Sequence, residues 1–445
     1  MPFAPLRGFR DYPPPDAGAR SELWRRMRSV ARRCGFAELE TPSLESLELF
    51  RVKSGDEISK QLWAFVDKSG RDVTLVAETT PSLARVFVDR AKAEPLPVKW
   101  FTISRLWRYE EPQSGRTREF AQFNLDILGV AGPAADAEVL ASAALLLDEA
   151  GADGLYAFRV NDRALAESLG RRLGAVDRDR FFRALDRYRK ISAADFRSEL
   201  AGAGATPDGI AALVALLARV GDGVPPSAFG EVLAELGAAA LDDEGRAGVA
   251  RLTRLLGELD RIGLGDRVVF DPTVVRGLAY YTSTVFEAFD RAGDSRALFG
   301  GGRYDHLIEL FGGPPTPAVG LAIGDQTFEL LLRRHGRWPD GEPALDTYVV
   351  AVTPAEAPTA REIVEGLRRA GVSADADLME RSLSRQLKEA ARRRARRALI
   401  VGPKELSRGA VVERDLATGA QREVPRAEIL PGRDGPSPPS GRASE

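Results

Sequence analysis

Residues 100–130 hold the densest set of chemically useful side chains in the chain, in the order WFTISRLWRYEEPQSGRTREFAQFNLDILGV. The second half of this segment is rich in aromatic and β-branched residues, which predicts a strand. Side chains alternate in direction along a strand, so Gln122, Asn124 and Asp126 share one face. Amides and a carboxylate beside arginines are poor core material, because buried charges are costly unless paired. The pattern predicts a polar binding face, and a solvent-facing sheet with surface salt bridges is the alternative.

The elements that must position this face are predicted from hydrophobic periodicity and from glycine and proline punctuation. The polar loop around Gly115 joins two strands. The predicted helices span 17–33, 81–92 and 325–334, and the predicted strands span 36–42, 62–67, 73–76, 98–109, 120–130, 267–270, 284–289 and 318–323.

Four further regions differ in character from this framework. Residues 161–264 are Ala-, Leu- and Arg-rich and amphipathic, which predicts an inserted helical domain. The Gly- and Pro-rich stretch 335–343 predicts a domain boundary, so the first domain would comprise 1–160 and 265–334. Beyond the boundary, strands and helices alternate across 345–432, which predicts a small α/β domain with parallel strands. The composition of 433–445 predicts a disordered tail.

Composition excludes several classes of protein. The chain has 445 residues and a formal net charge of −2, so it is not a polycation and DNA is not expected as a partner. A single cysteine, Cys34, excludes an internal disulfide and every Cys-x-x-Cys site. The two histidines, His306 and His335, lack zincin spacing, and we expect both to be structural or exposed. No Gly-Lys pair exists for a P-loop, and no signal or membrane segment is apparent, which predicts a cytoplasmic protein without a membrane partner.

The segment from Arg108 to Gln122 resembles motif 2 of class II aminoacyl-tRNA synthetases, in the form carried by the histidyl-tRNA synthetase family. Other stretches resemble the same family in the right order. They are Gly8–Asp11 with 36–42 and 48–50 (the N-terminal region and motif 1), 275–282 (the histidine signature), 300–305 (a glycine loop), and 381–388 with 415–419 (the anticodon-binding domain). The resemblance covers about residues 5–430.

This resemblance implies an α+β catalytic domain with an antiparallel sheet, a helical insert and a C-terminal α/β anticodon-binding domain. It also implies a histidine–tRNA ligase, which condenses histidine with ATP to histidyl-adenylate and passes the histidyl group to tRNA(His). Mg²⁺ is expected to accompany the ATP phosphates, with Glu110 and Glu119 as loose candidate ligands. Pro42 matches the motif 1 proline of class II dimers, so a homodimer is expected.

The resemblance also implies roles for individual residues. Arg108 and Arg276 would stabilise charge at the α-phosphate, where positioning and electrostatics matter more than a base. A carboxylate at Asp126 would accept the imidazole N–H and so distinguish histidine from apolar amino acids. The remaining expected contacts are Glu78, Thr80 and Gln122 with the substrate amino group, Tyr280 and Tyr281 with the substrate side chain, and Glu110 and Arg116 with ATP.

Three positions depart from the family pattern, because Thr327, Glu111 and Val76 stand where arginines are usual. Each charge-assisted contact with phosphate contributes about 1.5–3 kcal/mol, so their joint loss would weaken ATP binding unless other cations replace them. Arg105 and Arg303 are the nearby candidates.

Two motifs keep more than one interpretation. Gly300–Gly302 either allow backbone to approach a ligand or form a tight turn. The arginines at 392–394 and 396–397 either contact RNA or form a solvated helix end.

Two alternatives to the ligase also stand: a catalytically silent paralogue acting as a histidine-sensing regulatory subunit, and an adenylate enzyme with another acceptor. The region 345–432 argues against the regulatory subunit, which usually lacks it.

Overall fold

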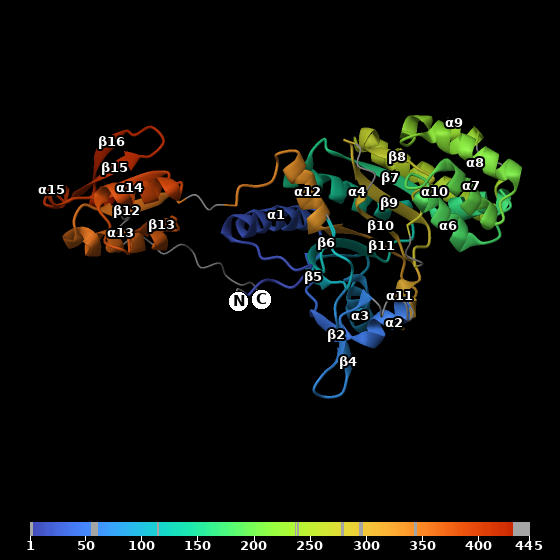
Figure 1. The fold of residues 1–445 in the computed structure, drawn as a ribbon, viewed down its shortest axis with the longest axis horizontal. Helices are drawn as coiled ribbons and strands as arrows, with labels where there is room; N and C mark the ends of the chain where they lie inside the picture. The colour runs from blue at the N-terminus through green and yellow to red at the C-terminus, as the bar shows by residue number, and fades with distance from the viewer. Residues whose placement is uncertain are drawn as a thin grey trace. The chain divides into compact units, whose positions relative to one another are not determined.

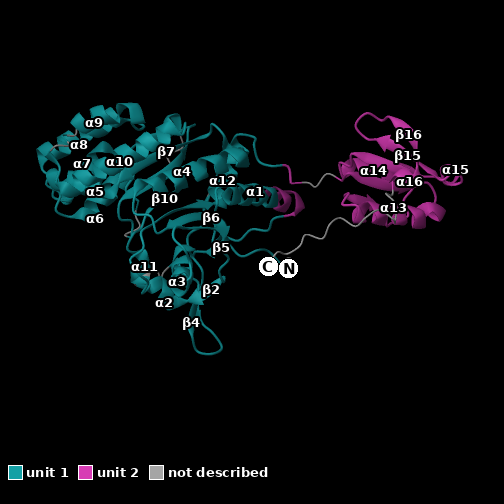
Figure 2. Cartoon of the chain, turned by 180° about the vertical axis from the view of Figure 1, so that it is seen from behind, with its two compact units in different colours: residues 1–12, 20–339 teal, residues 13–19, 340–445 magenta. Residues whose placement is uncertain are grey.

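The computed structural model describes residues 3–54, 61–113, 115–235, 237, 240–276, 280–292, 297–341 and 345–429. The chain divides into two compact units, which Figure 2 distinguishes by colour. Unit 1 comprises residues 1–12 and 20–339, and unit 2 comprises residues 13–19 and 340–445. The predicted tail at 433–445 lies outside the described residues.

An eight-stranded, mainly antiparallel sheet forms the centre of unit 1 (Figure 1). Only the pairings β1·β5 and β7·β8 are parallel among the described residues. In spatial order the strands are β1 (Ala37–Glu38), β5 (Val98–Trp107), β6 (Glu119–Leu128), β11 (Ala318–Gly324), β10 (Ala297–Arg303), β9 (Thr284–Asp290), β7 (Tyr156–Asp162) and β8 (Val268–Phe270).

The two faces of this sheet pack differently. Phe123, Leu125 and Ile127 of β6 belong to the main core, together with apolar side chains of α1 (Pro14–Arg33) and α4 (Pro133–Leu147). Burial of this continuous apolar layer is the main stabilising contribution to the unit. Helices α3 (Thr80–Arg90) and α11 (Leu307–Leu310) contribute to a second core cluster on the other face. Helix α12 (Asp325–Arg334) follows β11 directly.

The predicted hairpin near residues 62–76 is confirmed as part of a small separate sheet. Strand β3 (Ala64–Val66) pairs with β4 (Asp72–Leu75), and β4 pairs with β2 (Leu44–Ser46). Helix α2 (Leu47–Ser54) follows β2 directly.

Residues 163–261 are helical in their described part, as the amphipathic pattern predicts. The side chain of the residue before a helix accepts backbone N–H groups at five starts, which explains where these helices begin. The capped helices are α5 (Arg163–Arg172, cap Asp162), α6 (Arg178–Arg187, cap Asp177), α7 (Ala193–Gly202, cap Ser192), α8 (Pro207–Val220, cap Thr206) and α10 (Asp243–Arg261, cap Asp242), and α9 spans Phe229–Glu235.

Unit 2 contains a five-stranded sheet in the order β13–β12–β14–β15–β16. The three strands of the predicted alternation are parallel, as expected, but the sheet contains two further strands. Strands β13, β12 and β14 are parallel, but β15 and β16 add an antiparallel hairpin. The hairpin was missed because its turn, at Asp415–Gly419, was interpreted only as a family motif. The elements are β12 (Thr347–Ala351), α13 (Ala357–Arg369), β13 (Ala374–Ala376), α14 (Leu383–Arg392), β14 (Arg397–Val401), α15 (Pro403–Leu406), β15 (Ala410–Asp415), β16 (Gln421–Pro425) and α16 (Arg426–Ile429).

The glycine run 300–302 is neither a loop nor a turn. All three glycines lie inside β10, between β11 and β9. A glycine in the interior of a strand often marks a close approach of other groups.

Candidate active site

One face of the large sheet carries the polar row that the alternation predicts. Cross-strand neighbours point to the same side, so Asp126 shares its row with Trp100, Gly320 and Gly302. Cross-strand pairing likewise puts Asn124, Gly300 and Glu287 together in the next row. Asn124 and Asp126 are almost completely buried, at 3% and 2% exposure, so the solvent-facing alternative is wrong for them.

Glycines leave room on this face for the side chains of Asp126, Tyr281 and Arg276, and we call this part of the face the hollow. An ideal Cβ on Gly320 would lie 2.0 Å from Oδ1 of Asp126. One on Gly302 would lie 2.9 Å from the ring of Tyr281, and one on Gly300 would lie 1.4 Å from Nη1 of Arg276. Real Cβ atoms do not approach other atoms so closely. Because these glycines have no side chain, Asp126, Tyr281 and Arg276 can occupy the space beside them.

Aromatic side chains enclose Asp126. The hydroxyl of Tyr304 donates a hydrogen bond to Oδ1 of Asp126. The ring of Tyr280 lies 4.7 Å from that of Tyr281 and 6.0 Å from that of Tyr304, measured between centroids. Burial raises the pKa of Tyr304, and the nearby Asp126 raises it further. Tyr304 therefore remains a protonated donor at neutral pH.

Arg276 reaches the same hollow from a strained backbone. Its φ of +50° lies in the left-handed region, which costs a non-glycine residue about 1–2 kcal/mol. Its Nη1 lies 3.4 Å from Oε1 of Glu287, and its Cζ lies 5.6 Å from the ring centre of Tyr281. Burial opposes its charge, but Tyr281 and Glu287 outweigh burial and raise the pKa of Arg276. Residues 277–279 of the histidine signature lie outside the described residues.

Arg108 lies where β5 ends, and other chain segments fix its position. Its Nε donates to the carbonyl oxygen of Ala77 at 3.0 Å, directly before Glu78. Its guanidinium also lies over the ring of Phe120, at 5.3 Å. Glu78 is close enough to Tyr280 to raise the pKa of that phenol, although burial and Tyr281 contribute more. Arg108 and Glu78 are therefore anchored on adjoining segments.

The other predicted site residues lie on three elements of unit 1. Thr80 begins α3, and Gln122 lies opposite Ser104 and Gly324 in the sheet. Arg116 lies 3.4 Å from Glu110 in the loop between β5 and β6.

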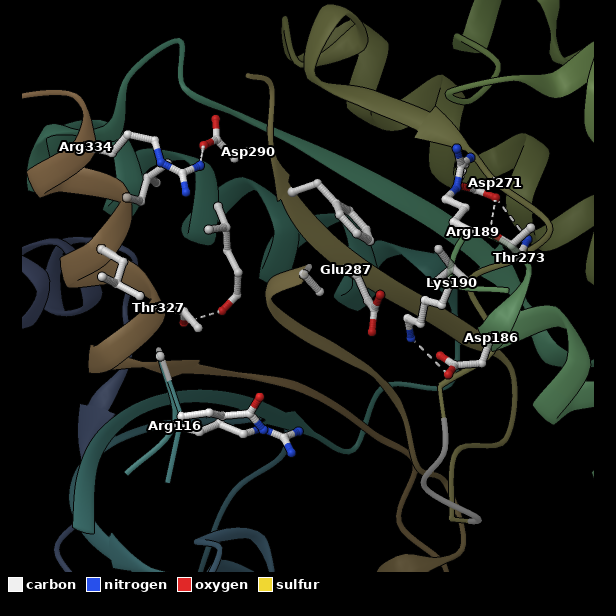
Figure 3. A pocket seen from close by; sticks show the side chains of 18 of the residues that line it. Arg116, Asp186, Arg189, Lys190, Asp271, Thr273, Glu287, Asp290, Thr327 and Arg334 are labelled. Carbon is white, nitrogen blue, oxygen red and sulfur yellow. Dashed lines mark hydrogen bonds and ion pairs between the residues drawn. The ribbon is translucent and has the colours of Figure 1, made fainter. Parts of the chain in front are cut away.

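A cavity of about 730 Å³ opens beside the hollow (Figure 3). Strands β9 and β10, α12, α6 and the loop between β5 and β6 all contribute to its wall. Glu287 lies near the middle of the view in Figure 3. The cationic residues that line the cavity are Arg116, Arg189, Lys190 and Arg334. The last three contact the carboxylates of Asp271, Asp186 and Asp290, respectively, at 3.0–3.1 Å.

The three departures from the family pattern have different surroundings. Thr327 lines the cavity, where its hydroxyl donates to the carbonyl oxygen of Leu298 at 2.7 Å. Glu111 is exposed and pairs with Arg7, and Val76 is buried in a small apolar cluster. The cavity cations are therefore the candidates to replace the missing charges.

The prediction that Arg303 compensates for them is wrong. Arg303 is 1% exposed and faces away from the hollow, where it pairs with Asp136 of α4. Arg105 is also excluded, because it lies opposite Ala121 and so on the other face from Gln122, with Glu119 as its partner at 3.2 Å. Strand alternation explains both results, since 303 follows Gly302 and 105 follows Ser104.

The surroundings of the two histidines fit the prediction that both are structural or exposed. His306 is exposed, and Nε2 of His335 lies 3.6 Å from Asp290 after the end of α12. Within the described ranges, no group of three or more His, Cys, Asp or Glu residues could hold a metal ion. Glu110 and Glu119 each face an arginine, which does not favour either as a magnesium ligand.

Sequence reasoning missed two contributors. Glu287 is the partner of Arg276, and the side chains of Asn161 and Arg163 hold the segment before Arg276. The alternation of side chains within the predicted strand 284–289 could have indicated Glu287. Nothing local identifies Arg163, because its partners lie over 110 positions away.

Comparison with known proteins agrees with this geometry. A family model described as histidyl-tRNA synthetase matches residues 8–327, and one described as an anticodon binding domain matches residues 346–432. The chain is 42% identical to histidine–tRNA ligase of Natronomonas pharaonis over 96% of both chains. It is 37% identical to that of Thermoplasma volcanium, over 97% of this chain and 98% of the relative. The crystal structure of histidyl-tRNA synthetase from Nostoc sp. PCC 7120 superposes with a TM-score of 0.83 at 23% identity, covering 96% and 98% of the two chains, which shows the fold.

These matches confirm the predicted fold class, an antiparallel-sheet catalytic domain followed by an anticodon-binding domain. The second match, over residues 346–432, does not favour the regulatory-subunit alternative. Sequence and fold thus agree, and the chain belongs to the histidyl-tRNA synthetase family.

Proposed function

We propose that the chain is a histidine–tRNA ligase that uses the hollow around Asp126 and Arg276 as its active site. The carboxylate of histidine attacks the α-phosphorus of ATP, the α–β anhydride bond breaks, and pyrophosphate leaves. A hydroxyl of the terminal ribose of tRNA(His) then attacks the histidyl carbonyl and releases AMP. The convergence of Asp126, Arg276 and Tyr281 on one glycine-lined face is the observation that carries the proposal.

Histidine would bind with its imidazole N–H donating to Asp126. The contact between Tyr304 and Asp126 supports this role, because it orients the carboxylate inside a buried pocket. Tyr281, with Tyr280 against it, would line the pocket beside the ring. Glu78 would accept from the α-amino group, with Thr80 and Gln122 nearby.

Arg108 and Arg276 would neutralise the charge that builds at the α-phosphate during in-line attack. Both guanidiniums stay charged, and each can contact two oxygens at once. The adjoining cavity supports a site for the rest of ATP, with Arg116 of the loop at its edge and Glu110 holding that loop. Magnesium would arrive with the ATP phosphates.

Histidine-dependent exchange of pyrophosphate into ATP, followed by charging of tRNA, tests the proposal. Exchange with charging supports the ligase. Exchange without charging supports the adenylate enzyme with another acceptor, and failure of both reactions supports the silent paralogue.

Two variants separate the proposed roles of the cations. Arg276→Ala should lower the rate of adenylate formation about a hundredfold or more and change ATP binding less, because about 2.7–4 kcal/mol of transition-state stabilisation is lost. Arg108→Ala should impair both, since it would also touch the phosphate in the ground state. Arg105→Ala, on the other face of the sheet, is the control and should leave both unchanged.

We also propose a homodimer formed through the small sheet. Leu44, Phe65 and Val66 are large apolar residues that are 42%, 50% and 63% exposed there, and Pro42 precedes them in the matching motif. Such exposure supports a protein interface. Light scattering should give a dimer that Val66→Asp weakens, whereas Val176→Asp, at an exposed apolar position among the helices, should not. A wild-type monomer at micromolar concentration would contradict this proposal.

Unit 2 would bind the anticodon region of the tRNA. A cavity of about 190 Å³, lined in part by Thr353, Arg361 and Gln386, supports a site for a nucleotide base. Within the described ranges, no helix is long and apolar enough to cross a membrane. We propose a cytoplasmic location, where tRNA is charged.

A further inference from the structure

Two residues where β7 ends and α5 begins, Asn161 and Arg163, contact the segment that leads to Arg276. The side-chain amide of Asn161 donates to the carbonyl oxygens of Pro272 and Val274, at 3.1 and 3.0 Å. Asp162 caps α5 and pairs with Arg251 of α10 at 2.8 Å. The strand end is therefore fixed to the helices on one side and to residues 272–276 on the other.

Arg163 makes the contacts nearest to the site. Its Nη1 donates to the carbonyl oxygen of Val275 at 3.0 Å and to that of Arg276 at 3.1 Å. Its backbone N–H donates to the carbonyl oxygen of Ser283 at 3.0 Å. One residue thus bonds to the chain on both sides of Tyr281, and it does so with only 8% of its surface exposed.

The backbone at Arg276 requires such support. A left-handed φ in a non-glycine residue persists only where its surroundings hold it. A buried carbonyl oxygen without a donor is costly, and Arg163 supplies donors at both 275 and 276. The resulting direction of the chain brings the guanidinium of Arg276 over Gly300 and toward Glu287.

We propose that Arg163 is a positioning residue for the reaction, which holds Arg276 in its strained conformation and so aims its guanidinium at the reacting phosphate. The role of Arg276 itself rests on the proposed function. In this proposal Arg163 makes no contact with the substrate, and its effect on adenylate formation passes through Arg276.

The helices restrain Arg163 in turn. Its guanidinium carbon lies 4.8 Å from the ring centre of Phe182 on α6. The same helix contributes Leu185 and Asp186 to the wall of the large cavity. A planar guanidinium suits this position, because it stacks on a ring while its edge donates to two carbonyl groups. A lysine would keep the charge without this geometry.

A double-mutant cycle on adenylate formation in single turnover tests the inference, with the full chain and saturating ATP and histidine. Arg163→Gln should slow the reaction at least about tenfold while histidine affinity, measured by calorimetry, changes less than about threefold. Because Arg163 acts through Arg276, the double variant Arg163→Gln/Arg276→Ala should be as slow as Arg276→Ala alone, within about twofold. Arg163→Lys should give an intermediate rate.

Arg187→Gln is the matched control, since Arg187 lies on α6, is half exposed and pairs with Glu199, and its loss should change nothing. A double variant slower by the full product of the two single effects would overturn the inference and leave the role of Arg276 standing. If Arg163→Gln does not fold, Arg163→Lys replaces it in the same double-mutant cycle.

A crystal structure of the variant provides a readout that is independent of activity. Arg276 should leave the left-handed region and its guanidinium should leave Gly300. Arg276 unchanged at both points would overturn the inference, whatever the rate. A wild-type protein that forms no adenylate would instead contradict the proposed function, and the crystal structure would still decide whether Arg163 positions Arg276.

Discussion

The guanidinium of Arg276 lies against Gly300, in volume that any side chain at position 300 would fill. An ideal Cβ there would be 1.4 Å from Nη1 of Arg276 and 2.7 Å from the carbonyl oxygen of Phe286. The contact joins two segments that are 24 positions apart in the sequence and explains why a central strand contains a glycine at this point.

Gly300→Ala should therefore displace Arg276. Adenylate formation should then be about tenfold slower or more, because the cation is no longer correctly placed. The crowding should also lower stability by about 1–3 kcal/mol. Single-turnover rates and thermal unfolding measure the two effects. Gly257→Ala, in α10 with nothing within 4 Å of the added Cβ, is the control and should keep the rate. An unchanged rate in Gly300→Ala would show that Arg276 does not work from this position.

Asp126→Asn should raise the dissociation constant for histidine about tenfold or more, because the imidazole N–H loses a charged acceptor in a closed pocket. ATP affinity should change less than about twofold, and calorimetry measures both. Tyr304→Phe is the companion variant, since it removes the donor to Asp126 and keeps the carboxylate. Its effect on histidine binding should be smaller. Unchanged histidine affinity in Asp126→Asn would make Asp126 a structural carboxylate.

The polar face was predictable because strand alternation alone sets it. Gln122, Asn124 and Asp126 lie two residues apart, so they share a side wherever the strand lies in the sheet. Their neighbours were not predictable in this way. Gly320 and Gly302 reach the row of Asp126 through pairings of strands more than 170 positions away, and such pairings leave no mark within a local segment.

Family resemblance indicated Arg276 and Tyr281, whereas Arg303 was a candidate substitute cation only because it lies near the site motifs in the sequence. Alternation within β10 puts Gly300 and Gly302 on the site face and Arg303 on the face of α4. The antiparallel hairpin of unit 2 was missed because the turn between β15 and β16 was interpreted only as a family motif.

Breaking the buried pair of Arg303 and Asp136 should destabilise the protein. Arg303→Met should lower the free energy of unfolding by about 3–5 kcal/mol, because Asp136 would remain as a buried charge without its cation. The double variant Arg303→Met/Asp136→Leu should recover much of the loss. Chemical unfolding of the full chain measures both. Arg105→Met, at a side chain that is 65% exposed, should change stability by less than about 0.5 kcal/mol. A mild effect of Arg303→Met, similar to the control, would refute the pairing.

The basic run of unit 2 is matched by carboxylates. Arg392 and Arg393 both pair with Glu389, at 2.6 and 3.0 Å, and Arg394, Arg396 and Arg397 also contact acidic side chains. This arrangement favours the helix-end interpretation of the run. The hydrogen bonds from Arg392 and then Arg393 lower the pKa of Glu389 from 4.5 to about 2.

The last prediction follows from the sign of this shift. A carboxyl group whose pKa is lower in the folded state contributes stability that is fully present above its unfolded pKa and is lost as pH falls. Glu389→Gln should therefore lower the midpoint of thermal unfolding above about pH 4.5, and the difference from wild type should vanish as the pH approaches about 2. Glu428→Gln, at an exposed position on α16, is the control and should follow the wild-type curve throughout. A difference between Glu389→Gln and wild type that stays constant from pH 7 to pH 2 would contradict the prediction, because it would arise from packing rather than from the charge of Glu389.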